Sequence, residues 1–372
     1  MRPETGYKEL ETSRFVRQRL KENGLSVVGP LAKTGMYVDI SGRHEGPTVA
    51  YRCDMDALPI QDAKNVPYAS RHAGVAHLCG HDAHMTVGLG VALLLNELRD
   101  DLHGTVRILF QPNEESTPSG SILMIRDGVL DGVEAVYCIH VDPTLDTGKF
   151  GLITGAITAS SDRFQVRVHT RTTGHSARPH QTRDTVWIAV QLLNQFYQLS
   201  GRVTDSRATS LITACMFSAS EAHNVIPCEV SLEGTLRTLD RESRSILLRY
   251  MRRTARQLAT LHDVGIDIRF IDRIPSILND ARLVDNVRRT VTQIFGDDAI
   301  FDIPVPSMGA DDFAHYLDHV PGMLLRVGTR ADRHTAHPLH DAHFDVDESF
   351  LKPTVQLVTT ALINHLQDCI MD

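Results

Sequence analysis

The segment 77–84, with the sequence HLCGHDAH, places a thiol and several imidazoles within a few positions. Cys and His are the strongest transition-metal ligands among the side chains, and only Gly80 separates Cys79 from His81. A glycine lets the backbone bend so that both side chains can turn toward one ion. The pattern alone also fits a buried thiol beside a structural histidine. Because an apolar stretch suited to a rigid helix follows, the segment favours a metal site.

Further ligand-type residues follow other apolar runs. Glu114 and Glu115 follow the run 106–110 after three intervening residues, and His140 comes after the run 133–139. Adjacent carboxylates repel each other unless a cation or a proton lies between them, so a solvated acidic turn is the alternative interpretation. At the end of a buried strand, one carboxylate could bind metal while its neighbour acts as a general base.

One more histidine of this kind lies near the C-terminus. His340 is part of the sequence HPLHD at 337–341, in which His337 is a rival for the same role. A histidine at a strand end is usually an ordinary surface or core residue. The interpretation of His340 as a metal ligand therefore depends on its position relative to the other candidates. Together with the cysteine, the other two histidines and the glutamates, it predicts a two-metal hydrolytic site.

Composition excludes several classes of protein. The 372 residues exceed one typical hydrophobic core, which predicts two domains. A net charge of −8 and a pI of about 6.2 argue against partners such as nucleic acid or an anionic membrane. The chain shows no signal-peptide pattern, and its six cysteines are scattered, mostly in apolar runs. We therefore expect reduced thiols and a cytoplasmic location.

Strands and helices alternate in the first part of the chain and again near its end. This order predicts an α/β layer architecture with a mixed, largely parallel sheet, and in such sheets functional groups gather at the carboxyl ends of the strands. The expected strands are 47–53, 105–110, 133–139 and 323–327, and the expected helices are 9–22, 85–98, 121–127 and 350–366.

The pattern changes between these parts. The order strand, helix, strand, strand, helix, strand is typical of a ferredoxin-like α+β unit, which is complete in itself. We therefore expect residues 163–273 to form an inserted domain, and residues 1–162 and 274–372 to form one domain that binds metal. The inserted elements are the strands 164–171, 210–217, 229–238 and 265–271 and the helices 184–199 and 241–261.

Several ordered sequence blocks resemble one family. They are RCDMDALP at 52–59, CGHDAH at 79–84, FQPNEE at 110–115, DGVLDGV at 127–133, TGHSARPH at 173–180, NVIP at 224–227, GTLRT at 234–238 and PSMGADDF at 306–313. The set resembles the amidohydrolase branch of the aminoacylase/carboxypeptidase-type dinuclear metallopeptidases. That branch includes hippurate hydrolase, indole-3-acetyl-amino-acid hydrolases and N-acetyl-diaminopimelate deacetylase. The resemblance extends from residue 2 to the C-terminal helix.

This resemblance implies a specific metal centre and a base. Glu114 matches the general base of the family. Two divalent metal ions are implied for each subunit, and zinc, manganese, cobalt and nickel all suit the donor types. The residues that match metal ligands are Cys79, His81, Glu115, His140 and His340.

The resemblance also implies roles outside the metal ligands. Asp56 matches a carboxylate that orients a ligand histidine. His175 matches a histidine of the inserted lid domain that reaches the active site of the partner subunit in a homodimer and stabilises the oxyanion. Asn224 and Arg237 match lid residues that bind the substrate, and Arg237 suits its carboxylate.

The activity implied is hydrolysis of N-acyl-L-amino acids, which are small molecules, to a carboxylic acid and a free amino acid. A dipeptidase or carboxypeptidase of the same family is the alternative. The two differ in whether the acyl side of the substrate carries a free amine. A protein that retains the fold without catalysis is a third reading, which the intact set of ligands and base disfavours.

Four departures from the family pattern leave every expected ligand in place. Cys53 stands where alanine is usual, and Asp311 replaces the more usual glutamate. Thr173 replaces a glycine before the lid histidine. The segment 116–120 replaces a run of glycines directly after an expected metal ligand, so we expect it to alter the pocket or the metal geometry.

Overall fold

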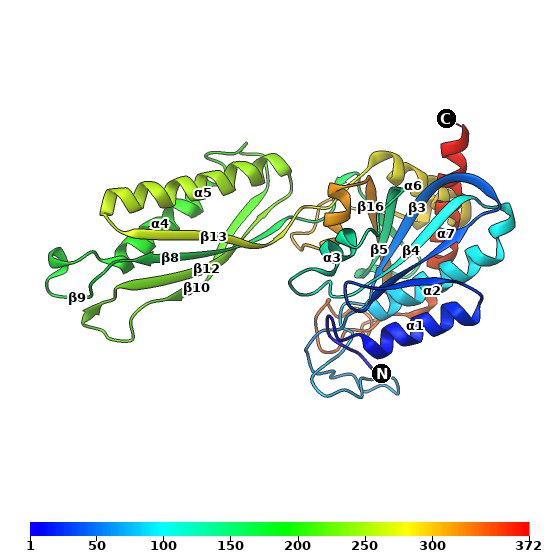
Figure 1. The fold of residues 1–372 in the computed structure, drawn as a ribbon, viewed down its shortest axis with the longest axis horizontal. Coiled ribbons are helices and arrows are strands. Elements are labelled where there is room, and N and C mark those ends of the chain that lie inside the picture. Colours follow the sequence, from blue (N-terminus) through cyan, green and yellow to red (C-terminus); the bar gives the residue numbers. More distant parts are fainter. Residues whose placement is uncertain (372) are drawn as a thin grey trace. The chain divides into compact units, whose positions relative to one another are not determined.

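The computed structural model describes residues 1–371, which form two compact units (Figure 1). The first unit comprises Met1–Ile157, Ile277–Val305 and the residues from Asp311 onwards. The second comprises Thr158–Ser276 together with Pro306–Ala310. Its main segment extends a few residues beyond each end of the predicted range 163–273.

The segment Pro306–Ala310 groups with the second unit, whereas the sequence predicts it within the discontinuous first domain. A β-bridge joins Thr158 to Ser307, and the backbone N–H of Ala159 donates to the carbonyl oxygens of Ser307 and Gly309. These local backbone hydrogen bonds attach the segment to the start of the second unit.

The first unit is built on an eight-stranded sheet with the order β1-β2-β4-β3-β5-β16-β6-β15. Figure 1 labels its central strands β4, β3, β5 and β16. The pairs β4 with β3, β3 with β5, β5 with β16 and β6 with β15 are parallel, whereas β1 with β2, β2 with β4 and β16 with β6 are antiparallel. The predicted mixed, largely parallel sheet is therefore confirmed. The strands are β1 (Val27–Leu31), β2 (Gly35–Ser41), β3 (His44–Asp54), β4 (His103–Gln111), β5 (Val133–Asp146), β6 (Phe150–Leu152), β15 (Ile300–Asp302) and β16 (Gly322–Arg330), with a separate short pair β7 (Gly155–Ala156) and β14 (Leu278–Asn279).

Helix α2 packs on the sheet and against α7 because two of its residues lack side chains. A Cβ atom at Gly88 would lie 2.6 Å from the sulfur of Cys53, and one at Gly90 would lie 2.7 Å from Val355 of α7. The helices of this unit are α1 (Leu10–Glu22), α2 (His81–Glu97), α3 (Gly120–Arg126), α6 (Ala281–Phe295) and α7 (Leu351–Met371), with the 3-10 turns η1 (Arg99–Asp101), η3 (Asp297–Ala299), η4 (Asp312–Asp318) and η5 (Glu348–Phe350).

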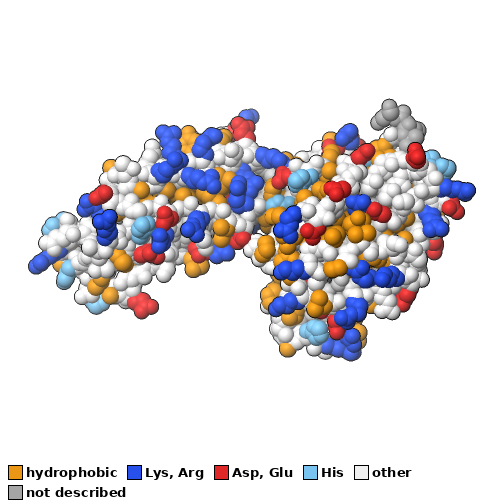
Figure 2. All heavy atoms as spheres, in the orientation of Figure 1, with side chains coloured by type: hydrophobic (Ala, Val, Ile, Leu, Met, Phe, Trp, Pro, Cys, Tyr) orange, Lys and Arg blue, Asp and Glu red, His pale blue; other side chains and the backbone are white. Residues whose placement is uncertain are grey.

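The second unit is an antiparallel sheet in the order β10-β12-β8-β13 with two helices, and this confirms the ferredoxin-like prediction. Phe164, Phe196 and Leu232 are buried in its core. The exposed side of α5 is rich in arginine, and the space-filling view shows cationic side chains over this unit (Figure 2). Its elements are β8 (Ser161–His169), β9 (Gly174–His175), η2 (Pro179–Gln181), α4 (Thr185–Leu199), β10 (Ser210–Ser218), β11 (Val225–Ile226), β12 (Glu229–Thr238), α5 (Arg241–His262) and β13 (Gly265–Ile274).

Several elements differ from the sequence expectation. Helix α2 begins at His81 instead of Met85. His140 lies inside β5, which continues to Asp146, and does not end it. The hairpin of β1 and β2 and the helix α6 were not expected. Within residues 1–371, no helix combines the length and the apolar character that crossing a membrane requires.

Candidate metal centre and active site

The five expected metal ligands come together in the first unit in two groups. Cys79, His81 and His140 form one group, and Cys79, Glu115 and His340 form the other. Within each group the ligand atoms all lie within 4.8 Å of one another. Cys79 belongs to both groups, so the arrangement suits two neighbouring ions that share one thiolate.

Gly80 makes the close approach of Cys79 and His81 possible. Its φ of 82° is in the left-handed region, which favours glycine. A Cβ atom there would also lie 2.4 Å from a methyl group of Val141 on β5. The glycine between the two ligand-type residues is therefore required by both conformation and space.

His81 and His140 are held by hydrogen bonds that leave the same ring nitrogen free. Nδ1 of His81 donates to the carbonyl oxygen of Asp56 at 2.9 Å, and Nδ1 of His140 donates to the carbonyl oxygen of Val141 at 2.8 Å. Nε2 of His81 is buried, and among the described residues it has no hydrogen-bond partner. Nε2 of His140 lies 3.5 Å from the sulfur of Cys79. Each imidazole thus presents a lone pair to the space where a metal ion would bind.

This donor set fits divalent metal ions. Burial raises the pKa of the Cys79 thiol to about 12, so the thiol needs a nearby cation to ionise at neutral pH. A buried ring nitrogen without a partner is costly unless a ligand satisfies it, and a metal ion would satisfy Nε2 of His81. One sulfur, imidazole nitrogens and a carboxylate are the donor types that zinc and its neighbours accept.

His84 is near this centre but is not available as a ligand. Ligand atoms of Asp54, His81 and His84 also lie within 4.8 Å of one another. Both ring nitrogens of His84 are used, however. Nδ1 donates to Asp54 at 2.7 Å, and Nε2 accepts from the backbone N–H of Val141 at 3.1 Å.

Asp56 holds the two glutamates through their backbone. Its Oδ1 accepts from the N–H of Glu114 at 3.0 Å and its Oδ2 from the N–H of Glu115 at 3.1 Å. The family resemblance predicts that the carboxylate of Asp56 orients a ligand histidine. The carbonyl oxygen of Asp56 makes the shorter contact with Nδ1 of His81, at 2.9 Å, whereas the carboxylate lies 3.3 Å from the same atom.

Glu114 lies among other carboxylates. It forms a cluster with Asp312, the first residue of η4, and with Asp311 just before it, and the backbone N–H of Asp312 donates to its Oε1 at 3.4 Å. Burial raises the pKa of Glu114 well above its ordinary value, and the charges of Asp311 and Glu115 raise it further. A carboxylate with a raised pKa is a stronger base, which suits a group that accepts a proton from water.

His340 occupies the position for which His337 was a rival. Nε2 of His340 lies 3.1 Å from Oε1 of Glu115, and its backbone N–H donates to the carbonyl oxygen of Leu78 at 2.7 Å. That backbone bond joins the loop around residue 340 to the Cys79 segment. His337 belongs to neither ligand group and instead lies 3.9 Å from Asp341.

The three lid residues are in the second unit and are not all together. His175 pairs with Val225 in the ribbon of β9 and β11, and the carbonyl oxygen of Asn224 accepts from the N–H of Ser176 at 3.1 Å. Arg237 is on β12, where its Nη1 donates to the carbonyl oxygen of Met308 at 2.7 Å.

The sheet register separates Arg237 from the ribbon. On β12, Leu236 pairs with Asp162 at the start of β8, and Glu229 pairs with His169 at its end. Those two ends of β8 are seven residues apart, or roughly 23 Å at a rise of about 3.3 Å per residue. The ribbon follows the His169 end, so Arg237 and His175 belong to opposite ends of the sheet.

Three residues of the blocks at 52–59 and 306–313 have no role predicted from the sequence, namely Arg52, Asp54 and Asp312. Arg52 is fully buried on β3 and forms ion pairs with Asp54 at 2.5 Å and Asp312 at 2.7 Å. The signal that could have identified it is an arginine inside an otherwise apolar strand, because a buried charge requires partners.

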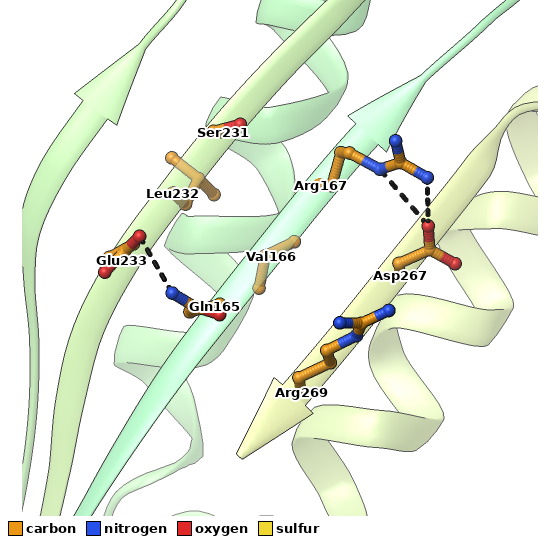
Figure 3. Close-up of a pocket in the computed structure, with 8 residues that line it drawn as sticks. All are labelled: Gln165, Val166, Arg167, Ser231, Leu232, Glu233, Asp267 and Arg269. Carbon is orange, nitrogen blue, oxygen red and sulfur yellow. Dashed lines mark hydrogen bonds and ion pairs between the residues drawn. The ribbon is translucent and has the colours of Figure 1, made fainter. Parts of the chain in front are cut away.

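A hollow of about 350 Å³ lies on the open face of the sheet in the second unit (Figure 3). Cross-strand pairs line it, including Arg167 with Asp267 at 2.9 Å and Gln165 with Glu233 at 3.0 Å. None of the expected site residues is among the eight that line it.

Comparisons with known proteins identify a family. The model for peptidase family M20/M25/M40 matches residues 50–364. An N-acetyl-L-cysteine deacetylase of Bacillus subtilis is 36% identical over 347 residues, which cover 93% of this chain and 81% of that protein. Thermostable carboxypeptidase 2 of Saccharolobus solfataricus is 34% identical over 354 residues, covering 94% of this chain and 89% of that protein.

A solved structure has the same fold. A dinuclear metal-binding peptidase of the M20 family from Bacillus subtilis superposes with a TM-score of 0.86 at 30% sequence identity. The match covers 98% of this chain and 94% of that one. The comparison therefore includes both units.

Proposed function

This chain belongs to peptidase family M20/M25/M40 and is a metal-dependent amidohydrolase, and from that premise we propose that it hydrolyses N-acyl-L-amino acids to a carboxylic acid and a free amino acid. The observation that carries the proposal is the pair of ligand groups that share Cys79 and lie beside Glu114. The relatives named as deacetylases support an amide of an amino acid as the substrate class.

We propose that the two groups bind two divalent ions through the five side chains predicted from the sequence. Bound divalent ions lower the pKa of water and polarise a carbonyl oxygen. Zinc, manganese, cobalt and nickel are the candidate ions. The members of the set are Cys79, His81, Glu115, His140 and His340.

Glu114 is the proposed general base. Its carboxylate takes a proton from the attacking water and later transfers it to the leaving amine, so the same group serves both steps of amide hydrolysis. Asp56 supports this role, because it fixes the backbone of Glu114 through a hydrogen bond of 3.0 Å. A base held by its own backbone keeps its orientation when the substrate enters.

Arg237 and Asn224 are the proposed substrate-binding residues. A guanidinium holds a carboxylate through two parallel hydrogen bonds, which suits the free acid of an N-acyl amino acid. The hydrogen bond from Arg237 to the carbonyl oxygen of Met308 at 2.7 Å supports this assignment, because it fixes one edge of the guanidinium and leaves the other available.

We also propose that the enzyme is a homodimer formed through the second unit. β10 is an edge strand, and edge strands are ready to pair with another chain. Next to it, the outer face of α4 exposes Trp187 at 54%, and β10 exposes Met216 at 55%. The other large exposed apolar side chains of these two elements are Val190, Tyr197, Leu211 and Phe217.

The dimer also accounts for the separation of His175 from Arg237. The two lie at opposite ends of one sheet, so one lid cannot bring both to the same substrate. In a two-fold dimer, Arg237 of one subunit and the partner subunit's His175 can serve one active site. The imidazole of His175 would then stabilise the oxyanion that forms on the substrate.

A cytoplasmic location is part of the proposal. Cys53, Cys79 and Cys138 are buried and free, which suits a reducing compartment.

A dipeptidase or carboxypeptidase activity is the alternative, and the carboxypeptidase relative favours it. The test is a panel of N-acyl amino acids, their carboxamides and matched dipeptides, assayed on protein reconstituted with each candidate ion. We expect the N-acyl amino acids to have the highest kcat/KM. Faster hydrolysis of the dipeptides would select the alternative, and no hydrolysis with any ion would reject both.

A further inference from the structure

We propose that Arg52, Asp54 and His84 form a chain of hydrogen bonds that positions His140 for metal binding; this inference rests on the metal centre proposed above. None of the three is a ligand in that proposal. We call this set the positioning chain. Each of its members is fully buried.

Arg52 anchors the positioning chain. Its Nη1 donates to Oδ2 of Asp54 at 2.5 Å, and its Nη2 donates to Oδ1 of Asp312 at 2.7 Å. Its Nε donates to Oε1 of Gln111 at 2.9 Å. All three nitrogens of one rigid guanidinium therefore donate a hydrogen bond, which a lysine could not reproduce.

Asp54 connects Arg52 to His84. Its other oxygen, Oδ1, accepts from Nδ1 of His84 at 2.7 Å. Because one oxygen is held by Arg52 and the other by His84, the carboxylate is fixed. A carboxylate that accepts from one ring nitrogen also sets the tautomer of a histidine, so Nε2 of His84 becomes an acceptor.

The side chain of His84 supplies a hydrogen-bond acceptor to β5 where β3 no longer pairs with it. β5 pairs with β3 only as far as Cys138, which is opposite Arg52. Beyond that point the β3 side of β5 has no backbone partner from β3, although β16 continues on the other side. Nε2 of His84 accepts the backbone N–H of Val141 at 3.1 Å in place of a carbonyl group of β3.

The next contact reaches the ligand itself. The carbonyl oxygen of Val141 accepts from Nδ1 of His140 at 2.8 Å, and this bond turns Nε2 of His140 toward Cys79. Val141 is thus held at its N–H by His84 and holds His140 at its carbonyl oxygen. Without His84, the backbone N–H of Val141 loses its hydrogen bond, and the carbonyl oxygen of Val141 that orients the His140 imidazole is held less firmly.

A second branch connects the same arginine to the base. Asp312, paired with Arg52, also accepts from Gln111 and from the N–H of Ser121. Its own backbone N–H donates to Glu114 at 3.4 Å. Substitutions of Arg52 would disturb both branches, so His84 is the residue that tests the His140 branch alone.

The test compares His84→Phe with His365→Phe. Phenylalanine retains the ring but removes both nitrogens. His365 is the matched control, because it is a partly buried histidine of the same unit that bonds a side chain, the hydroxyl of Tyr137, at 2.8 Å. Zn²⁺ and Co²⁺ affinities of the metal-free proteins are measured by competition with a chelator, and unfolding of the metal-free proteins is measured alongside.

We expect His84→Phe to weaken the binding of one ion by roughly 10–100-fold, the usual effect of removing a partner of a ligand, and His365→Phe to leave both affinities unchanged. The same change is then made in a His140→Ala background. If His84 acts through His140, the effect of His84→Phe should disappear there. An equal loss in both backgrounds would mean a general structural role and would overturn the proposal.

Unchanged affinity in folded His84→Phe would also overturn it. If that variant does not fold, His84→Leu takes its place under the same criteria, because leucine also removes both hydrogen bonds. Failure of the proposed function is a separate outcome. It would be seen as an inactive wild-type enzyme whose metal affinity still falls when His84 is replaced.

Discussion

Replacement of Asp56 by asparagine should loosen the segment that carries both glutamates of the site. The carboxylate is almost fully buried, with 2% exposure, and accepts one backbone N–H with each oxygen. Asparagine has nearly the same shape but only one acceptor oxygen. Its amide NH₂ group must therefore face the N–H of either Glu114 or Glu115.

The expected loss follows from these contacts. One hydrogen bond to a charged acceptor disappears, which is worth about 1.5–3 kcal/mol, and one buried N–H is left without a partner, at about 1–3 kcal/mol. The two effects overlap, because both describe the same N–H group. We therefore expect Asp56→Asn to lower the free energy of unfolding of the metal-free protein by about 3 kcal/mol.

The assay is urea denaturation followed by two signals. Circular dichroism reports on both units, whereas the single tryptophan, Trp187, lies on α4 and reports on the second unit. The change should shift the transition seen by circular dichroism more than the transition seen by tryptophan fluorescence. Asp285→Asn is the control, since Asp285 is an exposed carboxylate inside α6 and should change stability by less than about 0.5 kcal/mol. If Asp56→Asn is as stable as this control, the carboxylate does not hold the glutamates.

Glu114→Gln should retain nearly normal metal content while turnover falls by about 10²–10⁴-fold, and a variant with more than about a tenth of the wild-type rate would contradict the assignment of the base. Cys79→Ala should lose bound metal, as measured by elemental analysis, and full occupancy would remove Cys79 from the ligands. Arg237→Lys should lower kcat/KM for free-acid substrates by roughly 2–4 kcal/mol and for their amides much less; equal losses would assign Arg237 to structure. Met216→Glu should shift the enzyme from dimer to monomer in sedimentation. The control Leu261→Glu should leave the dimer intact, because that side chain is 72% exposed on α5. A wild-type monomer with full activity would refute the dimer.

The central sheet and the inserted unit could be predicted because their strands are apolar or alternate regularly. The strand 229–238 was predicted to the residue, since turn residues bound it on both sides. The hairpin of β1 and β2 escaped prediction because β1 contains Gly29 and Pro30, which weaken the strand pattern. α6 has a strongly amphipathic sequence, and its Asp280 cap accepts from the N–H of Arg282 at 2.9 Å, so a helix could have been predicted there.

Prediction of the site depended on two kinds of information. Residue types and strand ends were enough to select ligand-type side chains such as Cys79 and His140, but the division between Glu114 and Glu115 came from the family resemblance. The residues around His337 and His340 left the choice between them open, and the family resemblance selected His340. In the structure, the backbone bond from His340 to Leu78 holds His340 beside the other ligands.

The proposed metal ligands and the proposed substrate-binding residues lie in different units, so metal affinity and kcat/KM should respond to different substitutions. Every proposed metal ligand and the base belong to the first unit, whereas His175, Asn224 and Arg237 belong to the second. The positioning chain also lies wholly within the first unit. Metal affinity should therefore depend on the first unit alone, and substitutions of lid residues should change kcat/KM while leaving that affinity intact. A lid variant that lost metal would show that the donor set is incomplete without the second unit.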